Sequence, residues 1–229
     1  MSRSLIAPIA LACTLLCAMH ARADSVSFAG FANGSKTVNI QLSNPNVAKS
    51  LSTTAGGFST SLNGGPSFVS YCIDLYEYIS FGPTYTDYAL VSGAAHSFKN
   101  ADAASDIGKL YAENNLLDSA TKQAAFQIAI WEIAYETASA YSLGSGSAMF
   151  SGGTAATSGA LGLATTWLNA LSTTTNSTFK VSALDSIGNP GHQDQVFATP
   201  VPEPTTYALM AAGLLCIGAF ARRRAVRQD

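Results

Sequence analysis

Apolar and polar residues alternate over short runs in the first part of the chain and again near its end, which is the pattern of half-buried strands. Ser25–Ala29 and Thr37–Leu42 show it, and turn residues such as Asn33-Gly34 and Asn63-Gly64-Gly65 separate such runs. The clearest strand is Ser67–Tyr76. Further strands are predicted at Tyr85–Val91, Thr178–Leu184 and Gln195–Ala198.

The strand predicted at Ser67–Tyr76 has two different faces. One face carries Val69, Tyr71, Ile73 and Leu75, and the other carries Phe68, Ser70, Cys72, Asp74 and Tyr76. This alternation places Cys72 and Asp74 on the same side of the strand.

The period of the pattern changes to about 3.6 residues between Asn100 and Glu136. Asp102–Asn115 is predicted as a first helix, and a second helix begins after Asp118 or Ser119 as N-cap and runs to about Tyr135. Ser142–Gly159 is rich in Gly, Ser, Ala and Thr and is predicted as a long flexible loop, followed by a short helix at Leu161–Leu171. We therefore expect an α+β fold: a mostly antiparallel β-sandwich or barrel-like core with helices inserted at about 102–135 and 161–171.

Gln127 lies on an apolar stripe of the second predicted helix. The stripe follows the i, i+3, i+4, i+7, i+11 spacing of one helix face, and Ile130 and Ile133 widen it; its residues are Ala124, Gln127, Ile128, Trp131 and Tyr135. An amide on such a face needs partners, because leaving its hydrogen bonds unmade costs about 1–3 kcal/mol. One solution is an ordinary buried hydrogen bond to backbone; the other is reaction of the amide carbon.

The two ends of the chain are predicted to direct it through a membrane. Residues 1–23 resemble a secretory signal peptide: a positively charged N-terminal region is followed by an apolar region and by the small-x-small cleavage site Ala21-Arg22-Ala23. Residues 205–221 form an uncharged, apolar stretch at the short limit of a transmembrane helix, and the arginines of residues 222–229 place that tail in the cytoplasm. We expect an exported domain at 24–198 and a linker at 199–204.

Charge and cysteine content narrow the classes of partner. Asp24–Pro200 contains six lysines, twelve acidic residues and no arginine, a formal charge of −6, which argues against nucleic acid as a partner. Cys13 and Cys17 lie in the predicted signal peptide and Cys216 in the predicted membrane helix. The exported domain keeps only Cys72, so it cannot form an internal disulfide, and an unpaired thiol outside the cytoplasm needs protection.

A single reaction accounts for both Cys72 and Gln127. If the sulfur attacks the amide carbon, ammonia leaves and an internal thioester masks the thiol. An amine of another molecule, such as a lysine side chain, can then displace the sulfur and leave an isopeptide bond. The alternative is that Cys72 is a small buried hydrophobic residue and Gln127 an ordinary hydrogen-bonded one.

The segments around these two residues resemble the thioester domains of bacterial surface adhesins. Tyr71-Cys72-Ile73-Asp74 matches the cysteine-bearing strand of that family, and Phe126-Gln127-Ile128-Ala129-Ile130-Trp131 matches its Thr-Gln-x-Ala-Ile-Trp signature. The resemblance implies a thioester between Cys72 and Gln127, with Ala129 and Trp131 in packing positions, and with amine-bearing surface or matrix molecules as partners. Phe126 stands where the family has threonine, and Asp74 or Tyr71 could polarise the amide in its place.

The C-terminus resembles a PEP-CTERM sorting signal. Its three parts are present in order: the Pro202-Glu203-Pro204 motif, the apolar stretch, and the cluster Arg222-Arg223-Arg224. The resemblance implies an exosortase-type processing enzyme as partner, a transient stay in the inner membrane, and release toward the cell surface or extracellular matrix. A plain tail anchor with a proline-rich linker is the alternative.

Other chemistry is less favoured by the sequence. A cysteine hydrolase requires His96 or His192 beside Cys72, but both lie in polar, loop-like surroundings typical of surface histidines. The spacing of one cysteine and two distant histidines does not predict a metal site, and no cofactor is expected. We expect no enzyme, and keep a noncovalent structural or adhesive surface component as the second function.

Overall fold

The computed structural model describes residues 23–43, 48–114, 116–137, 139–175, 178–201, 209–210 and 212–217. Its strands are β1 (Asp24–Phe31), β2 (Lys36–Leu42), β3 (Lys49–Ala55), β4 (Phe58–Leu62), β5 (Phe68–Cys72), β6 (Thr84–Ser92), β7 (Ala148–Ser151), β8 (Phe179–Ser186) and β9 (Gln195–Pro200). Its helices include α1 (Ala103–Glu113), α2 (Ala120–Tyr135), α3 (Gly153–Thr157) and α4 (Ala160–Ala170).

Six strands close into a barrel in the order β1-β4-β5-β9-β8-β6, with β6 paired back to β1. Neighbouring strands of this barrel are antiparallel. The alternating positions expected in β1 do point inward, since Val26 and Phe28 are completely buried. The prediction of an antiparallel β core with inserted helices is therefore confirmed, and the core is the barrel form.

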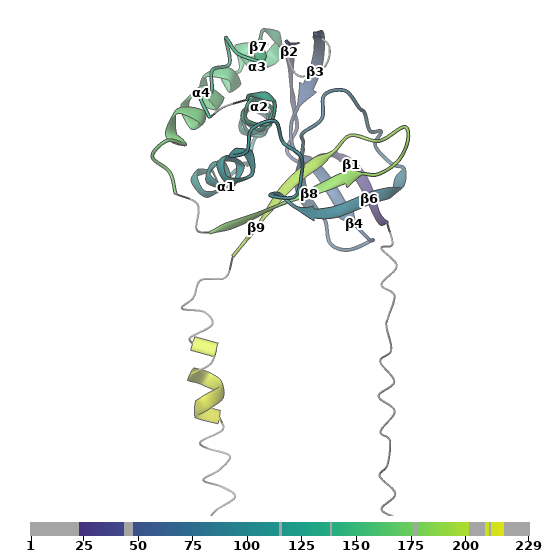
Figure 1. The fold of residues 1–229 in the computed structure, drawn as a ribbon, viewed down its shortest axis with the longest axis vertical. Helices are drawn as coiled ribbons and strands as arrows, with labels where there is room; N and C mark the ends of the chain where they lie inside the picture. The colour runs from purple at the N-terminus through teal and green to yellow at the C-terminus, as the bar shows by residue number, and fades with distance from the viewer. Residues whose placement is uncertain are drawn as a thin grey trace, which may run out of the picture.

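A second sheet of three strands, in the order β3-β2-β7, stands beside the barrel (Figure 1). The central strand β2 alternates buried Val38, Ile40 and Leu42 with exposed residues, so only one of its faces is covered. That face turns toward the helices.

The helix α2 occupies the centre of the molecule, between the barrel, the second sheet and α4 (Figure 1). Its N-cap is Ser119, one of the two residues that the sequence offered, and the Ser119 hydroxyl accepts the Lys122 N–H at 3.3 Å. All residues from Gln123 to Tyr135 are buried. The predicted apolar stripe, even with Ile130 and Ile133, was thus too narrow: this part of the helix is buried on every side.

Two local predictions were wrong. The strand expected at Ser67–Tyr76 ends at Cys72, because the Asp74 side chain accepts the Tyr76 N–H at 2.7 Å and turns the chain. The loop expected at Ser142–Gly159 contains β7 and α3, because residues 148–151 pair with β2. Alternation of side chains gives no sign of either event, since the first depends on a local side-chain hydrogen bond and the second on pairing with a distant strand.

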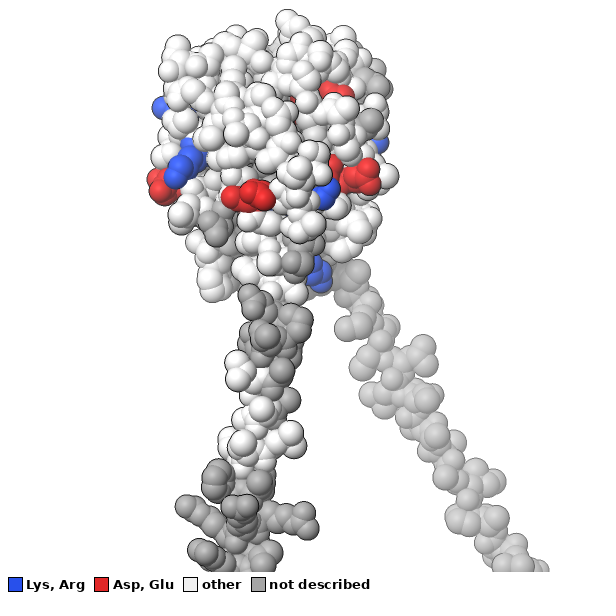
Figure 2. Space-filling model, turned by 90° about the vertical axis from the view of Figure 1, so that its left-hand side faces the viewer, with Lys and Arg blue, Asp and Glu red and all other residues white. Residues whose placement is uncertain are grey.

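The surface carries few charges. The side of the molecule formed by α1 and α4 shows isolated acidic and basic side chains on a mostly uncharged surface (Figure 2). This agrees with a chain in which 11% of residues are charged.

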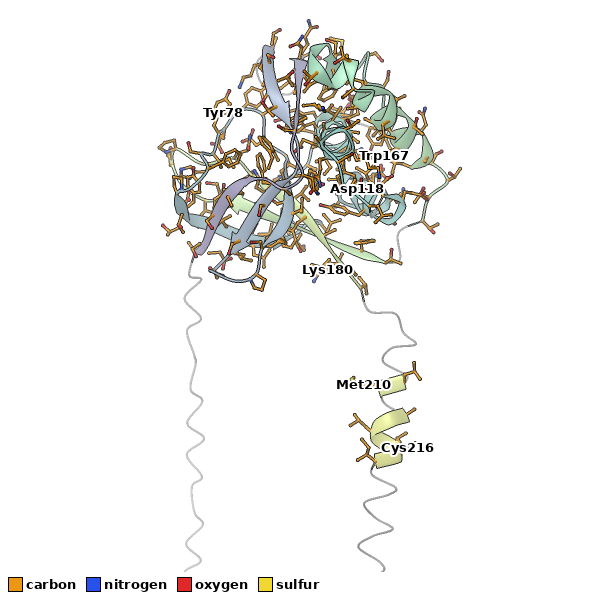
Figure 3. All side chains as sticks on the ribbon, turned by 180° about the vertical axis from the view of Figure 1, so that it is seen from behind. Tyr78, Asp118, Trp167, Lys180, Met210 and Cys216 are labelled. Carbon is orange, nitrogen blue, oxygen red and sulfur yellow. The ribbon has the colours of Figure 1, made fainter. Side chains whose placement is uncertain are left out.

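The C-terminal segment is helical at residues 209–210 and 212–217, and Cys216 lies on this exposed piece (Figure 3). Among the helices of the described residues, none combines the length and the apolar character needed to cross a membrane. Residues 205–208, 211 and 218–221 of the predicted transmembrane segment lie outside the described residues, as do residues 1–22 of the predicted signal peptide, Pro202-Glu203-Pro204 and Arg222-Arg223-Arg224.

Candidate functional site

A row of four side chains on α2 binds the end of β5 and the turn that follows. Gln123, Gln127, Trp131 and Tyr135 are spaced by four residues, so they lie along one side of the helix. Their partners follow the same order along residues 71–75. The helix therefore holds this segment at successive turns.

Gln127 and Cys72 are in direct contact through the backbone of Cys72. The Cys72 N–H donates to Gln127 Oε1 at 2.9 Å, and Gln127 Nε2 donates to the Cys72 carbonyl oxygen at 2.7 Å. Both residues are about 1% exposed. The structure thus brings together the two residues that the sequence singled out.

The geometry of β5 explains why Cys72 offers both backbone groups to Gln127. The Ile73 N–H donates to the Asp194 carbonyl at 3.0 Å, across the ladder between β5 and β9. Adjacent residues in an antiparallel strand direct their backbone groups to opposite sides, so those of Cys72 point away from β9. On that side β4 pairs with β5 only as far as Ser70, and the Gln127 amide takes the place of a neighbouring strand.

The thiol of Cys72 is held by two contacts. Its S–H donates to the Asp74 carbonyl oxygen at 2.7 Å, and the Trp131 indole N–H donates to the sulfur at 3.4 Å. Burial raises the pKa of the Cys72 thiol well above its ordinary value, although the Trp131 N–H opposes this. The thiol is therefore protonated at neutral pH.

Tyr71 and Asp74, which we expected to polarise the Gln127 amide, are engaged elsewhere. The Tyr71 hydroxyl donates to Gln123 Oε1 at 2.6 Å. The Asp74 carboxylate accepts from the Tyr76 N–H and, at 3.5 Å, from the Tyr135 hydroxyl. The group that does polarise Gln127 is the backbone N–H of Cys72.

Phe126 and Ala129 have packing roles. The Phe126 ring lies 4.8 Å from Tyr71, 4.8 Å from Tyr111 and 6.1 Å from Trp167, measured between ring centroids. Trp167, labelled in Figure 3, reaches this cluster from α4. Ala129 is completely buried in the core. The position that carries threonine in the resembling family therefore faces an aromatic cluster.

Sequence reasoning missed Gln123, Tyr135 and Gly57 as parts of this site. The four-residue spacing that links Gln123 and Tyr135 to Gln127 could have pointed to them. A Cβ at Gly57 would collide with Gln123 Oε1 and lie 2.6 Å from Val69 Cγ1, so only glycine allows this close approach. No local pattern predicts that requirement.

Each of the two histidines considered for a hydrolase is paired with an aspartate. His96 Nδ1 lies 2.7 Å from Asp185 Oδ1, and His192 Nδ1 lies 2.7 Å from Asp87 Oδ2. Within the described part of the chain, neither imidazole has a hydrogen bond to Cys72. His96 is only 13% exposed, so it is more buried than a surface histidine.

His96, Asp185 and Asp194 form the group of described side chains that comes nearest to a set of metal ligands, with donor atoms within 4.8 Å of one another. These atoms already have partners: His96 binds Asp185, and Asp194 Oδ1 accepts the Ser186 N–H at 2.7 Å. Burial raises the pKa of Asp194 to about 6, and nearby Asp185 adds to the effect. Each of these three described side chains thus has a hydrogen-bond partner of its own.

The PEP-CTERM protein-sorting motif is found at residues 200–224. No curated protein and no solved structure matches the chain. The motif marks an exported protein that is sorted by exosortase and processed toward the cell surface.

The backbone bridge between Gln127 and Cys72 is expected to stabilise the fold. Gln127→Leu leaves a buried N–H and C=O unpaired and should lower the free energy of unfolding by about 2–4 kcal/mol, measured by urea unfolding. Cys72→Ala keeps the bridge and should cost only about 1–2 kcal/mol. Neither variant can form a thioester, so loss of the thioester does not account for the difference between them. Equal losses in the two variants would contradict this role.

Proposed function

We propose that the exported domain forms an internal thioester between Cys72 Sγ and the Gln127 side chain, and uses it once to attach covalently to an amine-bearing partner. The observation that carries the proposal is the contact of the two residues in a site from which water is excluded, since both are about 1% exposed. The resemblance of the segments around them to surface thioester domains points the same way.

The contacts of the site fit the charge that develops in the reaction. When sulfur attacks the amide carbon, negative charge moves to Gln127 Oε1, which already accepts the Cys72 N–H at 2.9 Å. The backbone N–H of a nucleophilic residue acts in the same way in the oxyanion hole of serine proteases. The Trp131 N–H at 3.4 Å from the sulfur stabilises negative charge on that atom.

The reaction needs no other reagent. The Cys72 S–H bond and the Gln127 C–N bond break, a C–S bond forms, and the thiol proton leaves with the amide nitrogen as ammonia. Because burial keeps the thiol protonated, we expect formation to be slow. A slow step suffices for a bond that is made once in each molecule.

Export brings this domain to its partners. The predicted signal peptide at residues 1–23 starts export, and the apolar segment at 205–221 holds the chain in the inner membrane until exosortase processes it near Pro202-Glu203-Pro204. The released domain then reaches the cell surface or extracellular matrix, where lysine side chains are available amines.

Intact mass of the purified full chain tests the thioester. We expect a mass one ammonia below that of the sequence, and a gain of one methylamine after incubation with that amine. Cys72→Ala and Gln127→Ala should abolish both changes. Gln123→Ala is the matched control, because Gln123 is a buried glutamine one turn away whose amide binds Tyr71 and Leu117. An unmodified mass and a freely titratable thiol in the wild-type chain would refute the proposal.

A noncovalent surface or matrix component is the second candidate. It is favoured by the complete hydrogen bonding of the Gln127 amide to the Cys72 backbone, which satisfies the buried amide without any reaction. The same mass measurement separates the two functions.

A further inference from the structure

A pocket of about 580 Å³ lies where the barrel meets α1 and the first turn of α2. Its walls include residues of strands β5, β8 and β9 and of helices α1 and α2. The volume is typical of pockets that hold a small organic ligand. Neither Cys72 nor Gln127 lines this pocket, so it is a site separate from that pair.

Four partly exposed aromatic residues line the pocket. The rings of Phe68 and Phe197, from neighbouring strands, lie 4.6 Å apart between centroids, and those of Tyr111 and Phe179 lie 5.9 Å apart. The face of an aromatic ring carries partial negative charge, so it attracts the weakly positive C–H groups of a saturated ring. These side chains therefore favour a ligand with a face of C–H groups.

Three carboxamide side chains line the same pocket, and each is fixed by a hydrogen bond to the backbone. Asn33 Nδ2 and Gln123 Nε2 both donate to the Leu117 carbonyl, at 2.8 and 2.6 Å. Asn114 Nδ2 donates to the Leu110 carbonyl at 3.0 Å. Among the described residues, no hydrogen bond engages the side-chain oxygen of Asn33 or of Asn114. The pocket therefore has hydrogen-bond acceptors held in place beside its rings.

The lining residues argue against two other classes of ligand. None of the described lining residues is charged, so a phosphate, carboxylate or ammonium group would lose its hydration without gaining a counter-charge. A purely apolar ligand would cover the Asn33 and Asn114 oxygens and leave these acceptors unpaired, which lowers its affinity. A neutral saccharide avoids both costs, because its hydroxyl groups donate to the oxygens while its C–H face packs on the aromatic rings.

We propose that this pocket binds a pyranose ring of a neutral saccharide, with the C–H face of the ring on Phe68 and Phe197 and its hydroxyl groups donating to Asn33 and Asn114. Binding is noncovalent, and no bond is made or broken. The site acts independently of the proposed thioester, since it contains neither Cys72 nor Gln127. The exported domain would thus hold a neutral glycan whether or not it also reacts with an amine.

Saturation-transfer NMR on the full chain tests the proposal with glucose, galactose, mannose and N-acetylglucosamine. We expect at least one of the four sugars to bind, and to bind equally well to Cys72→Ala, which cannot form a thioester. Glucuronate and protonated glucosamine, which carry a charge on the same ring, should bind about tenfold more weakly or not at all. Affinity gel electrophoresis with a neutral polymer of the bound sugar then separates the sources: retardation indicates rings within a polysaccharide, and its absence indicates free sugars.

Phe197→Leu keeps an apolar side chain but removes the ring face, and Asn33→Ala removes one acceptor at an exposed position. Each should weaken sugar binding by about three- to tenfold. Phe81→Leu and Asn169→Ala are the matched controls outside the pocket and should change nothing, and urea unfolding checks that every variant is folded. The proposal is overturned if none of the four sugars binds the wild-type chain, if toluene binds and the sugars do not, or if the pocket variants bind as well as the controls.

Discussion

Phe126→Thr, which restores the threonine of the adhesin signature, is expected to lower the free energy of unfolding by about 3–4 kcal/mol without increasing thioester formation. The Phe126 ring fills a space between Tyr71, Tyr111 and Trp167, which come from three different elements. Threonine would leave a cavity there and bring a hydroxyl into an aromatic environment. Urea unfolding measures the loss, and intact mass with methylamine measures the reaction.

Phe126→Leu provides the control for volume. Leucine keeps most of the apolar contact, so we expect a loss of about 1–2 kcal/mol. A rise in ammonia loss or methylamine addition in Phe126→Thr but not in Phe126→Leu would show that a hydroxyl at this position assists the reaction. That result would contradict the arrangement in which the Cys72 N–H polarises Gln127.

The pairing of Cys72 with Gln127 could be predicted from the sequence because each residue is unusual where it stands. Removal of both predicted terminal segments leaves one cysteine, and helical spacing places Gln127 among apolar residues. These arguments say that the residues need partners. They do not say which atoms meet. The bridge from the Gln127 amide to the backbone of Cys72 forms because β4 begins only at Phe58, opposite Ser70.

The position of α2 was harder to predict. The spacing of apolar residues along this segment indicates an amphipathic helix, but the structure buries α2 on every side. Such burial depends on the second sheet and on α4, and α4 follows a segment that was predicted to be a loop. The strand β7 in that segment forms only because β2 offers a free edge, which is a long-range contact that local composition does not encode.

The same limit applies to the pairing of His96 with Asp185. His96 and Asp185 are 89 residues apart and meet because β6 pairs with β8. From the sequence, each looked like a polar residue near a loop. Strand pairing brings the two side chains together, and the Asp185 carboxylate then fixes the orientation of the His96 ring.

Glu132→Gln is expected to stabilise the protein by about 3–5 kcal/mol at pH 8 and to have little effect near pH 4. Glu132 is completely buried; its Oε1 accepts the Ser142 N–H at 2.6 Å, while Oε2 has no partner among the described residues. Burial raises the pKa of this carboxyl to about 8, partly opposed by that N–H and increased by nearby Glu136. The native state thus binds its proton more tightly than the unfolded chain does.

The sign of the effect follows from proton binding. Between about pH 4 and pH 8 the unfolded carboxyl is ionised and the native one is protonated, so stability falls as the pH rises through this window. Thermal or urea unfolding of both proteins over this range gives the difference, in which other titrating groups such as Asp194 largely cancel. A difference that does not change with pH would contradict the assignment.

Glu136→Gln is the control one turn further along α2. The Glu136 carboxylate accepts the N–H groups of Ser147 and Ala148 at 2.6 and 3.1 Å, so Glu136→Gln should not stabilise the protein to the same extent as Glu132→Gln.

Both glutamates hold the segment that leads into β7, whose Phe150 stacks on Trp131 with parallel rings. Ionisation of Glu132 should therefore loosen the support of the indole that binds the Cys72 sulfur, and we expect the domain to hold this site most firmly below neutral pH.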